Sequence, residues 1–197
     1  AIVLVLVLLL LFLGNLRAAL VVALILPLSA LATFVLMQQW GLSANLMSLG
    51  GLAIAIGMLV DAAVVVVENI EARQAEPGIS RLHSLYRATQ EVATPVSAGV
   101  VVIMIVFLPL LTLQGLEGKL FGPVALTIVF ALGASLVLSL TVIPVLASLA
   151  LRSGHHTAPW LVRKLEAGYA PLLEAALRHS KVVVAASLVA LAGAVAL

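Results

Sequence analysis

Residues 45–69 read NLMSLGGLAIAIGMLVDAAVVVVEN, a long apolar run that contains the single aspartate of the chain, Asp61. Taken over residues 46–67, a helix of this run is about 33 Å long at about 1.5 Å per residue. That length is enough to cross the roughly 30 Å hydrocarbon layer of a bilayer. The stretch therefore predicts a transmembrane helix with one carboxylate inside it.

The composition of the whole chain agrees with a membrane protein. Of its 197 residues, 64% are hydrophobic and only 9% are charged, whereas soluble domains have about 45–50% and about 25%. This balance excludes a soluble globular protein, a disordered region and a nucleic-acid-binding module, because a soluble domain needs a charged surface. The absence of cysteine excludes disulfides and thiolate metal sites. The four histidines do not follow a zinc-type spacing.

Other apolar runs, separated by polar turns, predict further spans. Residues 1–13 lack the basic leader of a signal peptide, so we expect them to be the end of a helix that begins before this chain. Gly14–Arg17 and Gln114–Pro123 are predicted polar loops, and Trp40 lies where an interfacial aromatic residue is expected. The predicted fold class is an all-α, polytopic membrane helix bundle. Its remaining spans are 18–37, 95–113, 124–151 and a last, truncated run over 182–197.

The basic residues indicate which ends of the spans face the cytoplasm. Short loops rich in lysine and arginine stay on the cytoplasmic side of a membrane. If the Gly14–Arg17 turn is cytoplasmic, all ten basic residues except Lys119 fall on that side. The residues on the cytoplasmic side are then Arg17, Arg73, Arg81, Arg87, Arg152, Arg163, Lys164, Arg178 and Lys181. We therefore predict that this turn is cytoplasmic.

Two connections between spans have an amphipathic helical pattern. In residues 79–92 and in residues 160–179, apolar side chains share one face and charged side chains lie mostly elsewhere. Helices of this kind lie in the membrane interface, and we expect both at the cytoplasmic face. The predicted organisation is a group of spans over residues 1–151, an interfacial segment over 152–180 and the start of another span over 181–197.

Asp61 is the first candidate functional residue. It lies about 7 Å to the cytoplasmic side of the centre of the 46–67 helix, where an ionised carboxylate costs about 2.5–3.5 kcal/mol on insertion scales. Carboxylates kept at such a depth are typical of proton or ion pathways. The alternative is a packing residue whose oxygens are satisfied by hydrogen bonds inside the bundle. Nearby small residues such as Gly57 and Ala62 would let neighbouring helices approach closely.

Glu68 is the second candidate. It follows Asp61 by seven residues, or two helical turns, so it shares a face with Asp61 and lies nearer the cytoplasm. One interpretation is that both carboxylates are successive stations for a proton. The other is that Glu68 is a solvated residue at the end of a helix, beside Asn69 and Arg73.

The 45–69 stretch resembles the fourth transmembrane helix of the resistance–nodulation–division (RND) superfamily of efflux transporters, including its Val-Asp and Glu-Asn pairs. Residues 107–123, FLPLLTLQGLEGKLFGP, are similar to the connection between helices five and six of the heavy-metal efflux branch. The resemblance covers essentially the whole chain. It implies transmembrane helices two to six, with helix two truncated, then an interfacial helix and the start of helix seven.

The same resemblance implies a proton-driven antiporter, not an enzyme, that exports heavy-metal cations of the copper/silver or zinc/cobalt/cadmium type. Asp61 corresponds to the proton-relay aspartate and Glu68 to the glutamate that follows it. Multidrug members have two adjacent aspartates where this chain has Asp61 and Ala62, which favours the metal branch. Copper-type members carry methionines nearby that pass soft metal ions, and Met58 is the candidate here, with core packing as the alternative. Divalent-type members often have an acidic residue where this chain has Ala55, so the metal stays open.

Partners and location also follow from the resemblance. It implies a multi-pass protein of the Gram-negative inner membrane, assembled as a homotrimer with a periplasmic adaptor and an outer-membrane channel and surrounded by lipid, without a cofactor. Large periplasmic domains and a second membrane half would lie outside this chain. The alternatives are a multidrug or lipid exporter with the same proton relay, and a non-transporting membrane scaffold or sensor.

Overall fold

The computed structural model describes residues 7–11, 14–74, 80–151 and 160–196. The chain divides into two compact units, residues 1–156 and 157–197. The predicted first span, residues 1–13, is described only at 7–11, which are helical. Arg152 belongs to the segment 152–159, which lies outside the described residues, and the predicted boundary at 151/152 adjoins this segment.

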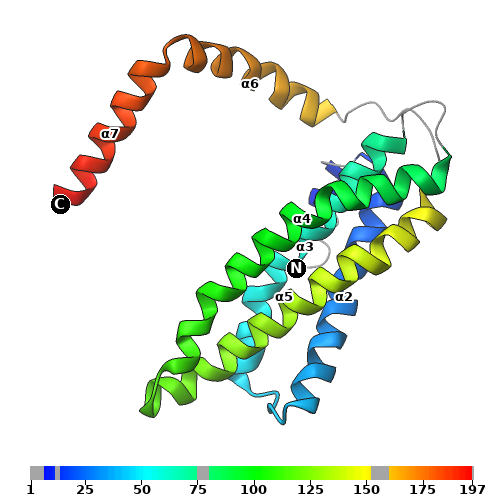
Figure 1. Ribbon diagram of the computed structural model, residues 1–197, viewed down its shortest axis with the longest axis vertical. Helices are drawn as coiled ribbons and strands as arrows, with labels where there is room; N and C mark the ends of the chain where they lie inside the picture. The colour runs from blue at the N-terminus through cyan, green and yellow to red at the C-terminus, as the bar shows by residue number, and fades with distance from the viewer. Residues whose placement is uncertain (1–6, 12–13, 75–79, 152–159, 197) are drawn as a thin grey trace. The chain divides into compact units, whose positions relative to one another are not determined.

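The first unit is a bundle of antiparallel helices (Figure 1). Among the described residues of this unit, four helices are long and apolar enough to cross a membrane. The connections α2–α3 and α4–α5 lie at one end of the bundle, as the predicted topology requires. The bounds are α2 Leu16–Gln39, α3 Leu46–Gln74, α4 Arg81–Phe107 with the 3₁₀ helix η1 Leu108–Thr112, and α5 Gly115–Ala150. The predicted all-α membrane bundle is confirmed.

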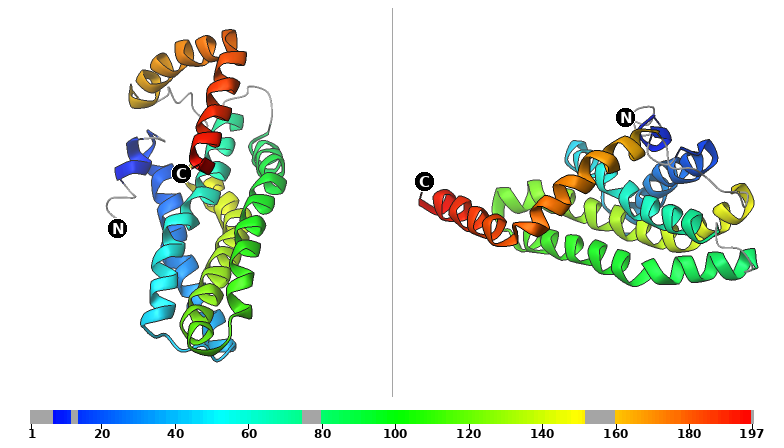
Figure 2. Two further views of the ribbon diagram at one scale, coloured as in Figure 1. Left: turned by 90° about the vertical axis from the view of Figure 1, so that its left-hand side faces the viewer. Right: turned by 90° about the horizontal axis from the view of Figure 1, so that it is seen from above.

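Helices α3 and α5 form the centre of this bundle, because each of them contacts α2, α4 and the other (Figure 2). Small residues bring the two backbones close together. A Cβ atom on Gly51 would lie only 2.7 Å from the carbonyl oxygen of Val124 on α5. Further along the same pair, the Ser135 hydroxyl donates a hydrogen bond of 3.0 Å to the Leu59 carbonyl of α3. The α3–α5 pair is thus fixed by close backbone packing and by one buried polar contact.

Local hydrogen bonds fix the turn between α2 and α3. The N–H of Leu42 donates to the carbonyl of Met37 and that of Gly41 donates to Gln38, which is the Schellman pattern that ends a helix. Gly41 has φ +68°, a conformation that strains any residue with a Cβ. Asn45 then caps α3, because its Oδ1 accepts from the N–H of Ser48 at 2.9 Å.

An aromatic contact holds the same turn against α5. The rings of Trp40 and Phe130 lie 5.3 Å apart between centroids, with an interplanar angle of 49°. Trp40 nevertheless remains 66% exposed. A large ring that is packed on one side and open on the other suits the boundary between hydrocarbon and water.

Two predicted boundaries are wrong. The sequence pattern predicts that Pro95 opens a span, but Pro95 lies inside α4, which begins at Arg81. The segment 81–92 is therefore continuous with the span, because its buried side chains Ser84, Leu85 and Ala88 pack it onto the bundle and keep the helix going across the proline. The pattern also predicts a polar loop over Gln114–Pro123, but α5 begins at Gly115 and includes Pro123.

A helical start suits the 115–123 stretch better than a loop does. Gly115, at φ +72°, reverses the chain in the space of a few residues after η1. Glu117 then lies in the first turn of α5, where a carboxylate is favoured by the positive end of the helix dipole. Backbone groups near a bilayer are best satisfied inside a helix, and the polar sequence does not prevent this.

The second unit contains α6, Trp160–Arg178, and α7, Ser180–Ala196. The helix predicted over 160–179 is confirmed as a helix, and its described side chains are mostly exposed. Val162–Arg178 and Ser180–Ala194 meet at an angle of 90°. A sharp bend of this kind would let an interfacial helix be followed directly by a membrane-spanning one. The predicted division into an interfacial segment, 152–180, and the start of a span, 181–197, stays a prediction.

The close approach at Gly51 gives a test of the packing. We expect Gly51→Ala to lower the free energy of unfolding by about 1–3 kcal/mol, because the new methyl group meets a backbone oxygen that cannot move aside. Gly133→Ala is the matched control, since its Cβ would meet only the flexible end of Met104 at 3.8 Å. The measurement is the thermal unfolding midpoint of the detergent-solubilised, full-length protein. Equal midpoints for the two variants would contradict the packing.

Candidate functional site

Helix α3 has two different faces. Its buried face contacts the rest of the bundle through residues such as Leu59 and Ala63, neither of which is exposed. On the other side, exposed residues recur at intervals of three or four along the helix and form what we call the outer stripe. The outer stripe consists of Ile54, Gly57, Asp61, Val65 and Glu68. The structure thus places both predicted carboxylates on one face, as their spacing predicted.

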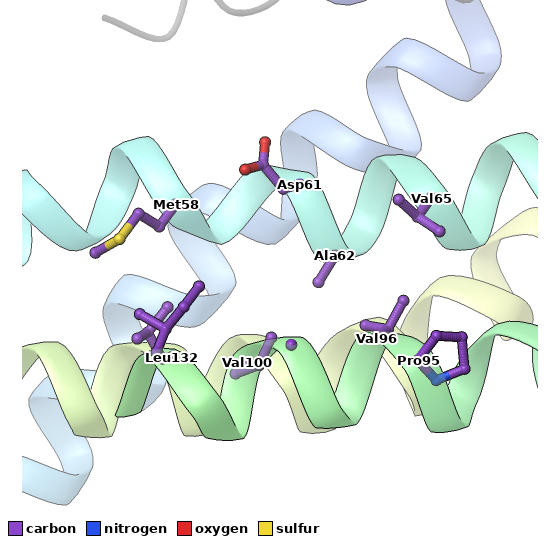
Figure 3. A pocket seen from close by; sticks show the side chains of 10 residues that line it. Met58, Asp61, Ala62, Val65, Pro95, Val96, Val100 and Leu132 are labelled. Carbon is purple, nitrogen blue, oxygen red and sulfur yellow. The ribbon is translucent and has the colours of Figure 1, made fainter. Parts of the chain in front are cut away.

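Asp61 also borders a groove between α3 and α4 (Figure 3). The groove has a volume of about 320 Å³ and an almost wholly apolar lining. Ala62 points across it toward α4, whereas the carboxylate of Asp61 is directed away from α4, at the rim. The opposite wall comes from α4, through Val96 and its neighbours, and Leu132 of α5 contributes to the lining. Asp61 is therefore the one ionisable residue of this groove lining.

Within the part of the chain that the structure describes, no residue donates a hydrogen bond to Asp61 or forms an ion pair with it. An ionised carboxylate facing lipid costs several kcal/mol, and such residues almost always face the bundle interior or a water-filled cavity. The packing interpretation required hydrogen bonds inside the bundle, and the described bundle supplies none. The outer stripe is consequently a face that needs protein or water against it.

Glu68 lies about 10 Å along α3 from Asp61, at the helical rise, and it is exposed. Its neighbours in sequence point elsewhere. Asn69 donates to the Ala88 carbonyl of α4 at 2.7 Å, and Arg73 contacts Glu91 of α4. The residues named as possible companions of Glu68 are thus engaged on a different face, and Glu68 shares the outer stripe with Asp61.

The sequence interpretation misses a polar network at this end of the bundle. The Arg73 guanidinium donates to both carboxylate oxygens of Glu91, at 3.0 and 2.7 Å. On the other flank of α3, the Asn15 amide donates to Glu71 at 2.8 Å. The spacing of Asn69 and Arg73 by one helical turn, followed by Glu91 in the next helix, is the signal that could reveal it. These bonds link α3 to α2 and α4 where the helices reach water.

Met58 lies on the wall of the groove beside Asp61. It is partly buried and packs against the cluster of Leu52, Leu59 and Leu132, as does Met104. Among the described residues there is no group of three or more histidine, cysteine or acidic side chains that could hold a metal ion. Met58 is therefore placed where a thioether could face the groove, and its role in metal transfer stays a prediction.

Similarity to known proteins shows which family this chain belongs to. The profile of the AcrB/AcrD/AcrF family matches residues 1–197, the whole chain. The chain belongs to the AcrB/AcrD/AcrF family. It is 43% identical over 93% of its length to the protein HelA of Legionella pneumophila, and 43% identical over 92% to the cobalt-zinc-cadmium resistance protein CzcA of Cupriavidus metallidurans. A crystal structure of a heavy metal efflux pump matches 75% of the chain with a TM-score of 0.64 and 42% identity.

The chain spans only part of these proteins. It covers 18% of the length of HelA and of CzcA, and 14% of the heavy metal efflux pump. The resemblance to the heavy-metal efflux branch of the RND superfamily is confirmed by the family profile and these relatives together. The chain is thus related to one segment of much longer efflux proteins.

The Arg73–Glu91 pair gives a second test. We expect Arg73→Glu and Glu91→Arg each to lower the thermal midpoint of the full-length protein, because each variant places two like charges together. The double exchange should restore much of the loss, since opposite charges again face each other. The two side chains are 40% and 38% exposed, so the differences should shrink in high salt. A double exchange less stable than both single variants would contradict the pairing, and Lys119→Glu is the control for charge alone.

Proposed function

We propose that this chain is the proton-carrying part of an antiporter that exports heavy-metal cations in exchange for protons. The observation that carries the proposal is the outer stripe of α3, where Asp61 lies at membrane depth without a described partner and Glu68 follows toward the cytoplasm. A carboxylate in this position can lose or gain a proton when water or a basic residue reaches it. The family membership supports a transport role for the pair.

In this proposal the outer stripe is covered by the second membrane half of a longer transporter. A methyl group added to Gly50 or Gly57 would meet no other atom within 4 Å, so another helix could approach the α3 backbone there. The chain then provides transmembrane helices two to six, α6 is the interfacial helix and α7 is the start of helix seven. The coverage of 18% of the relatives' length supports this arrangement.

The proton step works through charge. When Asp61 is ionised, it attracts a cationic side chain of the facing half, and protonation removes that attraction. The favoured arrangement of the two halves then changes, as in other switches driven by local electrostatics. Because α3 is fixed to α5 at Gly51 and to α4 through Arg73 and Glu91, a shift of α3 would carry both neighbours with it.

The cargo is proposed to be a heavy-metal cation. CzcA, a relative at 43% identity, is named for resistance to cobalt, zinc and cadmium, and Met58 would be the residue of this chain that meets a soft metal. The working assembly would be a homotrimer in the inner membrane, together with a periplasmic adaptor and an outer-membrane channel. Neither a cofactor nor a chemical reaction is part of the proposal.

Replacing the carboxylate tests the relay. In the full-length protein, Asp61→Asn should abolish metal resistance and metal-driven proton flux in proteoliposomes, because an amide cannot take up and release a proton. Asp61→Glu should keep part of both activities. Val65→Ala, on the same stripe, is the control for a change of packing. Unchanged flux in Asp61→Asn, with normal expression, would reject the relay and favour a scaffold or sensor.

Replacing Glu68 should slow transport without abolishing it. We expect Glu68→Gln to slow proton-coupled metal export several-fold, since the route from the cytoplasm to Asp61 loses one station. The control is Ile54→Ala, at the opposite end of the outer stripe. The measurement is the initial rate of metal-driven proton movement in proteoliposomes. A rate equal to that of the unchanged protein would show that Glu68 is only a solvated residue.

A further inference from the structure

A second groove lies between the first turns of α4 and the last turns of α5. It has a volume of about 230 Å³. Leu82, Tyr86 and Thr89 line it from α4, and Val145 and Ser148 line it from α5. Leu82 and Tyr86 are 77% and 65% exposed, and Val145 is 58% exposed. The groove is therefore open and mainly apolar, and it runs along the outside of the bundle.

One basic side chain, Arg81, lies beside Leu82 at the end of this groove. Arg81 donates a hydrogen bond to the Leu151 carbonyl at the end of α5, so its guanidinium spans the end of the groove. His83 and Arg87 are also exposed on this part of α4, but they do not line the groove, and Glu91 lies one helical turn from Arg87 and offsets its charge. A guanidinium has five N–H donors, and the Leu151 carbonyl takes one of them.

The groove lies at the level where a membrane changes from hydrocarbon to headgroups. Helix α5 is apolar near its end, over Val145–Ala150, apart from Ser148, and these turns belong to the hydrocarbon side. Arg81, at the first position of α4, marks the polar side. Tyr86 lies just over one helical turn further into α4 than Arg81, beside Val145 and Ser148, a depth at which interfacial tyrosines occur. An apolar groove with a cationic side chain at its polar end has the shape and charge of a phospholipid-binding site.

We propose that this groove binds an anionic phospholipid of the cytoplasmic leaflet. The phosphate lies against the remaining donors of Arg81. One acyl chain lies along the groove, in contact with Leu82 and Val145. A free phosphate would gain nothing from the apolar walls, and a zwitterionic lipid would gain less from Arg81. The site depends on the membrane orientation of the bundle and not on proton coupling by Asp61.

Lipid titration of the full-length protein tests the site. Native mass spectrometry in detergent would compare phosphatidylglycerol with phosphatidylcholine of the same acyl chains. We expect tighter binding of phosphatidylglycerol and an approximately fivefold loss of that preference in Arg81→Gln, which corresponds to about 1 kcal/mol per basic side chain near an anionic surface. Lys119→Gln removes an equal, exposed charge at the other end of α5 and should keep the preference.

Two further variants separate a binding role from a structural one. Arg81→Lys should keep most of the preference, since the charge remains, even though its contact with the Leu151 carbonyl is altered. Ser148→Phe should weaken binding of both lipids by filling the groove while every basic residue stays in place. Equal binding of the two lipids, or equal losses in Arg81→Gln and Lys119→Gln, would overturn the proposal. Transport loss in Asp61→Asn with lipid preference retained would show that the site is independent of the relay.

Discussion

An ionised carboxylate at membrane depth is costly when it faces lipid, and the position of Asp61 on α3 makes this cost the constraint on what can lie against the outer stripe. The inner face of α3 is already occupied, because α2, α4 and α5 all contact it. Its outer stripe, with Asp61 and Glu68, is exposed in this unit. Helix α3 is thus covered by α2, α4 and α5 on its inner face, whereas its outer stripe, which carries the two carboxylates, is uncovered in this unit. In the proposed transporter, this open face of α3 lies against the second membrane half.

In the described part of the first unit, the polar contacts between helices that involve charged side chains lie at the end of the bundle where α3 ends and α4 begins. Arg73 and Glu91 pair between α3 and α4, and Asn15 contacts Glu71 between α2 and α3. The middle of the bundle relies on small residues and on hydroxyl groups that bond to backbone carbonyls, such as Ser135 with Leu59. Polar contacts at the ends and close packing in the middle make α2–α5 one body.

Several boundaries depended on contacts that a local pattern does not contain. Pro95 was a plausible start for a helix, since proline is favoured in a first turn. In the structure the helix passes through it, because Leu85 and Ala88 bury the preceding turns against the bundle. The polar stretch after η1 was a plausible loop, but Gly115 makes the reversal in so little chain that helix α5 begins at once. The groove at Arg81 brings together residues from two helices, and no single stretch of sequence predicts it.

The sequence alone determined the membrane character, the spans around residues 18–37 and 46–67, the helical fold and the shared face of Asp61 and Glu68. These follow from hydrophobicity, length and helical period, which are properties of contiguous residues. Only the tertiary structure decided that this face is the open one, that Gly51 is the close contact with α5, and that Arg73 pairs with Glu91. Those facts depend on which helix packs against which, and that choice is made by the fit of side chains far apart in the chain.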